Sequence, residues 1–236
     1  MSDLLKVDKL EAFYGAGQVL HGVSLNVARG EQVALLGRNG MGKTTFLRAV
    51  MGLVPDTRGH VYLDGRDMRG AAPETIARAG IALVPEGRGV FGSLSVIENL
   101  TMAARAGIDG RCTWTLDRIY QLFPRLHERR NNGGHQLSGG EQQMLTIGRA
   151  LMTNPQLMLI DEATEGLAPL VAKDIWTTLG VIRNEGVATI VVDKDFRSLS
   201  KIADRMVMLS KGVVVFDGTP AALSDNHGLL EQHLGV

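Results

Sequence analysis

Residues 37–44 read Gly-Arg-Asn-Gly-Met-Gly-Lys-Thr and match the pattern GxxxxGK[ST] at every defined position. Glycines leave the backbone N–H groups of such a loop open to a phosphate, and a following helix presents its positive N-terminus to the same group. The segment stands between an apolar run, Gln32–Leu36, and a helical pattern from Lys43 to Met51. It therefore predicts a strand, a phosphate-binding loop and a helix in succession, within an α/β fold.

Two side chains of this loop have chemistry of their own. The Lys43 amine can reach the β- and γ-phosphates of a bound nucleotide, and the Thr44 hydroxyl can ligate Mg²⁺. The predicted nucleotide-binding residues of the segment are Gly37, Arg38, Asn39, Gly40, Met41, Gly42, Lys43, Thr44 and Thr45.

The apolar runs of the chain predict two kinds of strand. Runs that lack polar alternation are typical of strands buried on both faces of a parallel sheet. They are Gln32–Leu36, Gly80–Val84, Leu157–Ile160 and Ala188–Val192. The N-terminal region alternates more, and Asp64-Gly65 is a hairpin signal. Its predicted strands, which we expect to form an antiparallel sheet beside the parallel core, are Leu4–Tyr14, Gln18–Val27 and His60–Leu63.

The rest of the chain predicts mainly helices. Residues from about Ser95 to Arg130 show helical patterns and few strand signals, which indicates an inserted helical subdomain. Another helix is predicted from near Ser138 to a point before Pro155. The last strands are predicted at Arg205–Leu209 and Val213–Asp217, with a short helical tail from Pro220.

Two carboxylates, Asp161 and Glu162, follow the apolar run Leu157–Ile160. A carboxylate at that strand end can hold Mg²⁺, directly or through water, opposite Thr44. The adjacent Glu162 can polarise an attacking water as a general base. Many strands end in acidic residues, so this pair indicates a Mg²⁺ site and a general base only in combination with the phosphate-binding loop.

The segment Leu137–Gln143 reads Leu-Ser-Gly-Gly-Glu-Gln-Gln. Ser138 is suited to be an N-cap, the two glycines leave the backbone open, and the glutamate falls in the first helical turn. A second set of N–H donors at a helix N-terminus predicts a second phosphate-facing surface on the same chain. Its residues are Ser138, Gly139 and Gly140.

Charge and cysteine content narrow the classes of function. Lysine and arginine total 25, as do aspartate and glutamate, so the net charge is zero and bulk nucleic-acid binding is disfavoured. Cys112 is the only cysteine, which excludes an intrachain disulfide and fits a reducing compartment.

The first residues lack the features of a secretory signal, and no apolar run approaches the roughly 20 residues of a membrane span. We expect a soluble, cytoplasmic chain with any membrane role supplied by partner subunits.

The phosphate loop, Leu137–Gln143 and Leu159–Ala163 together make the chain, over residues 1–236, resemble an ABC-type nucleotide-binding subunit. The resemblance implies a P-loop NTPase core with a mostly parallel sheet, an N-terminal antiparallel β subdomain and an inserted helical signature subdomain at about 92–150. It implies an ATP hydrolase that uses ATP and Mg²⁺. It also implies a head-to-tail dimer, with ATP between the phosphate loop of one subunit and Ser138–Gly140 of the other.

Further site residues follow from the resemblance. Tyr14 matches the aromatic that stacks on adenine. Glu86 occupies the position, usually glutamine, that touches both Mg²⁺ and the membrane subunit, and it keeps an oxygen ligand there. Ala168 stands where an aspartate is usual. Lys194 replaces a histidine that contacts the γ-phosphate; it can donate to the phosphate but cannot relay a proton as a neutral imidazole can, so we expect slower hydrolysis than is typical.

Four segments resemble the ATPases of branched-chain amino acid importers. In that subfamily Glu86 and Ala168 are ordinary, whereas Lys194 departs from the expected glutamine. The resemblance implies a second ATPase subunit, membrane permease subunits and, indirectly, a periplasmic solute-binding protein, with this chain peripheral at the cytoplasmic face of the inner membrane. The four segments are Val84–Arg88 with Val90-Phe91, Glu141–Leu151, Glu165–Pro169 and Leu234–Val236.

The sequence leaves several alternatives open. Urea and other amide importers share most of these segments. A soluble ABC ATPase acting on ribosomes or DNA would carry tandem cassettes or a long coiled-coil insertion, which this chain lacks. A regulatory module that binds ATP without hydrolysing it is favoured by Lys194 and Ala168, and an exporter ATPase would need export-type partners. The transported solute and the choice between a homodimer and a heterodimer are not fixed by the sequence.

Overall fold

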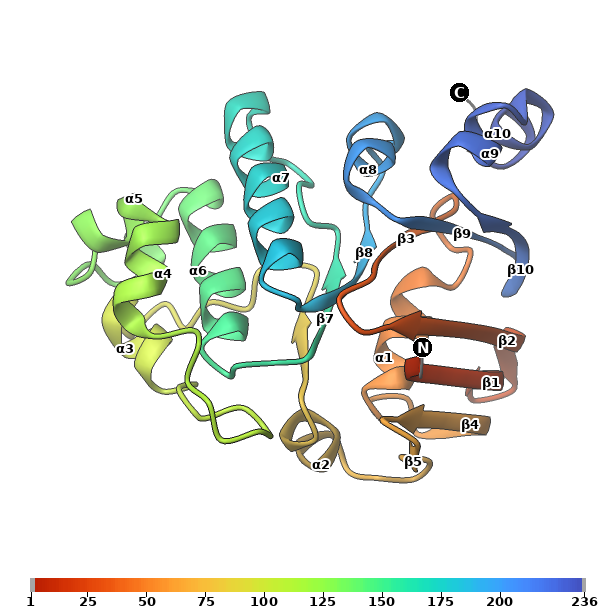
Figure 1. The fold of residues 1–236 in the computed structure, drawn as a ribbon, viewed down its shortest axis with the longest axis horizontal. Coiled ribbons are helices and arrows are strands. Elements are labelled where there is room, and N and C mark those ends of the chain that lie inside the picture. Colours follow the sequence, from red (N-terminus) through yellow and green to blue (C-terminus); the bar gives the residue numbers. More distant parts are fainter. Residues whose placement is uncertain (1–2, 235–236) are drawn as a thin grey trace.

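The larger of two sheets carries the loops that matter for function (Figure 1). The computed structural model describes residues 3–234, so the Gly235-Val236 end of the predicted subfamily segment lies outside the described residues. The strand order is β10-β9-β3-β8-β7-β6, and β10 alone runs antiparallel to its neighbour. The strands are β3 (Gln32–Leu36), β6 (Ile81–Val84), β7 (Leu157–Asp161), β8 (Ala188–Val192), β9 (Arg205–Ser210) and β10 (Val213–Gly218). All four predicted parallel strands are confirmed, with shifts of one residue at most.

The register of the parallel strands brings three loops to one edge of the sheet. Leu35 of β3 and Asp161 of β7 both pair with Val192 of β8, from opposite sides. The loops that follow β3, β7 and β8 therefore leave the sheet at the same level. In parallel sheets this carboxyl-terminal edge is where ligands bind.

The second sheet is antiparallel, as predicted, with the order β2-β1-β4-β5. Its turn at Asp64-Gly65 has positive φ at both residues (49° and 76°), which is the backbone of the predicted hairpin. β4 begins earlier than the predicted strand from His60. The strands are β1 (Asp3–Tyr14), β2 (Gly17–Ala28), β4 (Asp56–Leu63) and β5 (Arg66–Asp67).

Alternation along β3 divides the apolar core between the two faces of the parallel sheet. Val33 and Leu35 pack with the antiparallel sheet and α1, whereas Ala34 and Leu36 pack with the helices on the other face. Figure 1 shows α3–α6 gathered on the far side of β7 from the antiparallel sheet. The helices are α1 (Lys43–Val50), α2 (Pro73–Arg78), α3 (Val96–Thr101), α4 (Leu116–Leu122), α5 (Pro124–Glu128), α6 (Gly139–Leu151), α7 (Pro169–Asn184), α8 (Phe196–Ile202), α9 (Pro220–Ser224) and α10 (His227–His233), with a 3₁₀ turn at Gly134–Gln136.

Within residues 3–234, no helix is both long and apolar enough to cross a membrane.

The expected helical stretch from Ser95 to Arg130 is only partly correct. Helices α3, α4 and α5 lie within it, but residues 103–114 form turns and irregular chain. Gly110, at φ 77°, occupies a left-handed conformation, and the Gly107 N–H bonds the Arg111 carbonyl oxygen at 2.8 Å rather than a helical partner. Glycine favours such turns over a continued helix.

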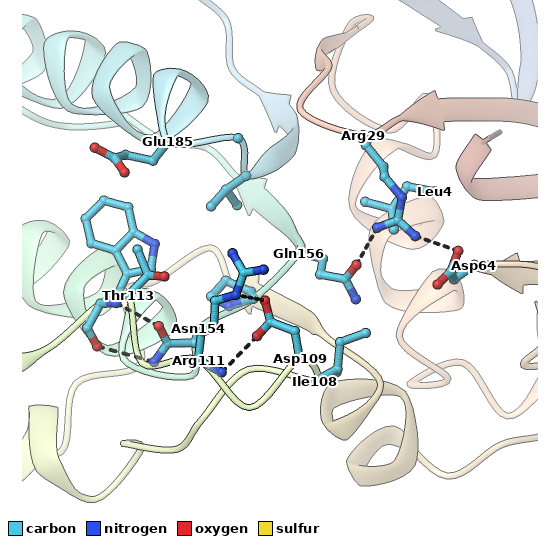
Figure 2. Close-up of a pocket in the computed structure, with 14 residues that line it drawn as sticks. Leu4, Arg29, Asp64, Ile108, Asp109, Arg111, Thr113, Asn154, Gln156 and Glu185 are labelled. Atoms are coloured by element: carbon cyan, nitrogen blue, oxygen red, sulfur yellow. Dashed lines mark hydrogen bonds and ion pairs between the residues drawn. The ribbon is translucent and has the colours of Figure 1, made fainter. Parts of the chain in front are cut away.

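The half-buried side chain of Asn154, between α6 and β7, holds this irregular segment in place. The Asn154 amide accepts a hydrogen bond from the Trp114 N–H (2.7 Å) and donates to the carbonyl oxygens of Arg105 (2.9 Å) and Trp114 (3.3 Å). Figure 2 shows Asn154 reaching into this segment at one end of a crevice of about 530 Å³, with Arg29 and Asp64 of the antiparallel sheet region at the other. Asn154 itself has φ 49°, a conformation that asparagine tolerates well.

We predict that Asn154→Ala destabilises the chain by about 1–3 kcal/mol, because it leaves the Trp114 N–H without its partner and puts alanine at a positive φ. The midpoint of thermal unfolding should fall by roughly 2–10 °C, measured by circular dichroism. Asn131→Ala, at an exposed position, is the control and should leave the midpoint unchanged. Equal midpoints for both variants would show that Asn154 does not hold the segment.

Candidate functional site

The loop between β3 and α1 is shaped by its contact with the β9–β10 turn. Gly37 has φ 141°, and a Cβ placed on it would lie 2.4 Å from the Leu209 carbonyl oxygen, so no other residue fits. The Gly212 N–H bonds the Met41 carbonyl oxygen at 3.2 Å. The loop is therefore fixed at both ends before helix α1 begins at Lys43.

The Lys43 side chain crosses the mouth of this loop. Its Nζ donates hydrogen bonds to the carbonyl oxygens of Gly37 (2.7 Å) and Arg38 (3.0 Å), and the residue is only 7% exposed. Burial lowers the pKa of the Lys43 amine; the negative charge of Asp161 opposes this shift, and the positive charge of Lys194 adds to it. The amine thus lies across the mouth of the loop, bonded to two of its carbonyl oxygens.

Asp161 is the buried carboxylate opposite the loop. It is 3% exposed, and its Oδ1 has no hydrogen-bond partner. Burial raises the pKa of Asp161, the Thr44 hydroxyl lowers it, and the negative charge of Glu86 raises it further. A buried carboxylate oxygen without a partner is costly unless a cation meets it. The donor set of Asp161, Thr44 and Glu86 therefore fits a hard divalent cation such as Mg²⁺.

Glu162, directly after β7, has φ 52°, a left-handed conformation that is uncommon for a glutamate. Its Oε2 is buried without a hydrogen-bond partner, and its Oε1 lies 3.9 Å from the Lys194 Nζ. The strained backbone turns this side chain away from the strand direction and toward the loops after β6 and β8. Such strain is typical of functional sites.

Lys194 joins a group of acidic side chains. Its Nζ forms an ion pair with the Glu165 carboxylate, and this contact raises the pKa of the Lys194 amine. Carboxylate oxygens of Glu86, Glu162 and Glu165 lie within 4.8 Å of one another beside it. Glu165 was not among the site residues predicted from the sequence; the only signal for it was its place in the segment that follows Asp161-Glu162. The predicted contact between Lys194 and a phosphate stays a prediction.

The loop that carries Glu165 is held by Asp193. One carboxylate oxygen of Asp193 accepts hydrogen bonds from both the N–H and the hydroxyl of Thr164, each at 2.8 Å. The other accepts from the Asp195 N–H at 2.9 Å. The loops after β7 and β8 are thereby joined, which fixes the approach of Lys194 to Glu165.

Tyr14 ends β1 and is 46% exposed. The hairpin that follows it contacts the phosphate loop region: a Cβ on Gly42 would lie 2.9 Å from the Leu20 side chain, and the His21 N–H bonds the Gly212 carbonyl oxygen at 2.9 Å. An exposed aromatic ring at this hairpin is free to stack on a flat ligand.

The predicted second phosphate-facing surface lies apart from this group. Ser138 caps α6 in a full capping box with Glu141, and Gly140 packs so closely on α7 that a Cβ would lie 2.5 Å from Val171. Within residues 3–234, no hydrogen bond or ion pair joins residues 138–140 to residues 37–45. The structure thus brings the phosphate loop, Glu86, Asp161, Glu162 and Lys194 together. Of the predicted second surface, Ser138 is exposed, Gly139 is half-buried and Gly140 is buried.

Comparison with known proteins decides the family. The sequence profile described as "ABC transporter" matches residues 20–165. The chain is 41% identical over 232 residues to the high-affinity branched-chain amino acid transport ATP-binding protein BraG of Pseudomonas aeruginosa, covering 98% of this chain and 100% of BraG. The chain belongs to the ABC transporter family. It is the ATP-hydrolysing subunit of a transporter, and such subunits work as dimers with membrane permease partners.

Other members of the ABC family are similar at lower identity. The lipopolysaccharide export system ATP-binding protein LptB of Escherichia coli K12 is 32% identical over 233 residues, 98% of this chain and 97% of LptB. A solved ATP-binding subunit of an ABC transporter superposes with a TM-score of 0.83 at 30% identity, over 96% of this chain and 94% of that one. A dimeric ATP-binding cassette with bound ADP and Pi gives 0.79 at 25% identity, over 92% and 98% of the two chains.

We predict that Asp161→Asn raises the unfolding temperature of the ABC subunit without nucleotide at pH 8. The folded state holds the Asp161 pKa above its ordinary value, so it disfavours the ionised form, and this cost is present above the raised pKa and disappears as the pH falls toward the ordinary value. The difference from the wild type should therefore shrink on acidification. Differential scanning fluorimetry between pH 8 and pH 4.5 measures it.

The same Asp161→Asn variant should lose the additional stabilisation that Mg²⁺ gives in the presence of ATP. Asp225→Asn, at an exposed aspartate near the C-terminus, is the control and should follow the wild type throughout. If Asp161→Asn unfolds at a lower temperature than the wild type at pH 8, the ionised Asp161 carboxylate does not destabilise the folded chain.

We predict that Lys194→Ala lowers ATP turnover by about 10- to 100-fold and weakens ATP binding, because it removes a charged donor near the phosphate site. Phosphate release and a fluorescent ATP analogue measure the two effects. Lys201→Ala, an exposed lysine of α8, should leave both unchanged. Unchanged turnover and affinity in Lys194→Ala would rule out the phosphate contact.

Proposed function

We propose that the chain powers the import of branched-chain or related amino acids through partner permease subunits. The full-length similarity to BraG, at 41% identity, carries this proposal. A periplasmic solute-binding protein would deliver the solute, and this chain would lie at the cytoplasmic face of the inner membrane. We take residues 1–236 as one ABC domain with a helical signature subdomain at about 92–150.

Each residue of the site has its own role in ATP binding and hydrolysis under this proposal. Tyr14 stacks on adenine, the loop Gly37–Thr45 binds the phosphates, and Glu162 accepts a proton from the attacking water. Thr44, Asp161 and Glu86 would hold Mg²⁺, which supplies a positive charge at the phosphates when bound. Lys194 adds a donor near the γ-phosphate.

Each complete ATP site needs residues from two subunits, so a dimer would contain two such sites. In the proposed arrangement ATP lies between the phosphate loop of one ATPase subunit and Ser138, Gly139 and Gly140 of the other. The separation of these surfaces within one chain, and the exposed position of Ser138, support it. ATP binding would draw the subunits together, and hydrolysis would release them.

An apolar groove next to the site suits the permease contact. It has a volume of about 400 Å³ and lies between β6, α3 and α6, with Phe91 (48% exposed) and Met102 (56% exposed) at its surface. The Arg149 guanidinium lies over the Phe91 ring, 5.0 Å from its centre. The groove adjoins the loop of Glu86, so movement of a docked permease segment would be coupled to the nucleotide.

The similarity to LptB supports a second candidate, an ATPase of an export system, at lower identity. A urea or amide importer remains a further alternative within the import class, and a soluble ABC ATPase without a permease is the alternative outside transport. The partners of the chain distinguish these candidates.

The proposal is tested by recovering the tagged chain from native membranes in mild detergent and identifying its partners by mass spectrometry. Import predicts two permease subunits, a second ATPase and a solute-binding protein that binds leucine, isoleucine or valine in calorimetry. A binding protein selective for urea or an amide would change the proposed solute from a branched-chain amino acid to urea or that amide. Export-type partners, or recovery without any permease, would overturn import and leave the ATPase chemistry unaffected.

We predict that Glu162→Gln lowers ATP turnover by about 10²- to 10⁴-fold and leaves ATP affinity intact, because glutamine keeps the size of the side chain but cannot accept the proton. Phosphate release and equilibrium binding of a fluorescent ATP analogue measure the two. Glu231→Gln, at an exposed glutamate of α10, should behave as the wild type. Turnover that is equal in Glu162→Gln and the wild type would contradict the role of Glu162.

A further inference from the structure

Arg88 has a strained backbone that the surrounding helix holds in place. Its φ is 66°, a left-handed conformation that is unfavourable for an arginine. The Thr146 hydroxyl of α6 contacts the Arg88 carbonyl oxygen, and Arg149 of α6 donates to the Gly89 carbonyl oxygen at 2.7 Å. The turn after β6 is thus fixed against α6, and it fixes the direction in which the Arg88 side chain leaves.

The Arg88 guanidinium lies directly against the N-terminus of α6. A Cβ placed on Gly139 would lie 2.8 Å from its Nη1 and 3.1 Å from its Cζ, so the guanidinium packs directly on the Gly139 backbone. A Cβ on Gly166 would lie 3.9 Å from its Nη2. The cation therefore sits between the first residue of α6, next to the N-cap Ser138, and the loop that follows Glu165.

This guanidinium has no anionic partner. Across residues 3–234, its side chain takes part in no ion pair or hydrogen bond. Of the glutamates in the adjoining segments, Glu141 is engaged with the Ser138 N–H at 2.8 Å, and Glu165 is paired with Lys194. A cation at the positive end of a helix is repelled unless an anion lies between them.

We propose that Arg88 binds the terminal phosphate of the ATP held by the phosphate loop of the opposite subunit, beside Ser138. This inference rests on the two-subunit site of the proposed function. Arginine presents several donors in one plane and suits the oxygens of a phosphate. ADP lacks the terminal phosphate, so Arg88 contributes to closure with ATP and not with ADP.

The test uses the Glu162→Gln chain as parent, in which ATP is bound but not turned over, and measures ATP-driven dimerisation by sedimentation velocity. Arg88→Gly removes the guanidinium and relieves the left-handed strain, so its unfolding temperature should equal or exceed that of the parent. Its ATP-driven dimerisation should weaken by about tenfold or more. Its affinity for a fluorescent ATP analogue as a monomer should not change, because the phosphate loop is intact.

Two further variants separate the charge from the packing. Arg88→Lys keeps the positive charge and should lie between Arg88→Gly and the parent. Arg66→Ala, an exposed arginine of β5 on the antiparallel sheet, is the matched control and should dimerise as the parent does.

Two results would overturn the proposal directly. One is dimerisation of Arg88→Gly with ATP as tight as that of the parent. The other is a loss of dimerisation matched by an equal loss of ATP affinity in the monomer. That result would show that Arg88 binds the nucleotide held by the phosphate loop of its own subunit. A Glu162→Gln parent that stays monomeric with ATP, both alone and when mixed with the second ATPase subunit of the transporter, would instead contradict the two-subunit site itself, and the role of Arg88 with it.

Discussion

The pairing of β8 between β3 and β7 is the constraint on which the nucleotide site depends. Because Leu35 and Asp161 face the same residue of β8, Val192, the phosphate loop and the two carboxylates leave the sheet at one level. A shift of one residue in the β7–β8 pairing would turn Asp161 to the other face of the sheet, and the same shift in the β3–β8 pairing would displace the phosphate loop relative to Asp161. The apolar runs buried on both faces hold this register, so the fold positions the chemistry through its core.

The fold bears a cost at the same edge of the sheet. Asp161 and Glu162 each have a buried carboxylate oxygen without a partner, and Glu162 and Arg88 have left-handed backbones. Each feature is unfavourable in the isolated chain, and each faces a place where phosphates, a cation or a water would lie. These unfavourable features are those expected of one subunit of a dimer whose site is completed by the nucleotide and by the second subunit.

Sequence patterns could predict the parts of this site that depend on local chemistry. The strands around the phosphate loop, the cap at Ser138 and the turn at Asp64-Gly65 follow from neighbouring residues. The pairing of Lys194 with Glu165 could not be predicted, because it joins loops that are 29 residues apart. The irregular segment 103–114 was missed since its backbone is satisfied by Asn154, a residue far along the chain. The contact of Arg88 with Gly139 depends on a positive φ that no pattern at an arginine signals.

The central claim is that each ATP is hydrolysed between two subunits, and mixing two inactive variants tests it most directly. Lys43→Ala disables the phosphate loop, and Ser138→Arg disables the surface that faces the other subunit. Mixed in equal amounts, they should recover about a quarter of the wild-type phosphate release, since half of the dimers are mixed and each has one intact site. A mixture that forms dimers but stays as inactive as either variant alone would contradict the claim.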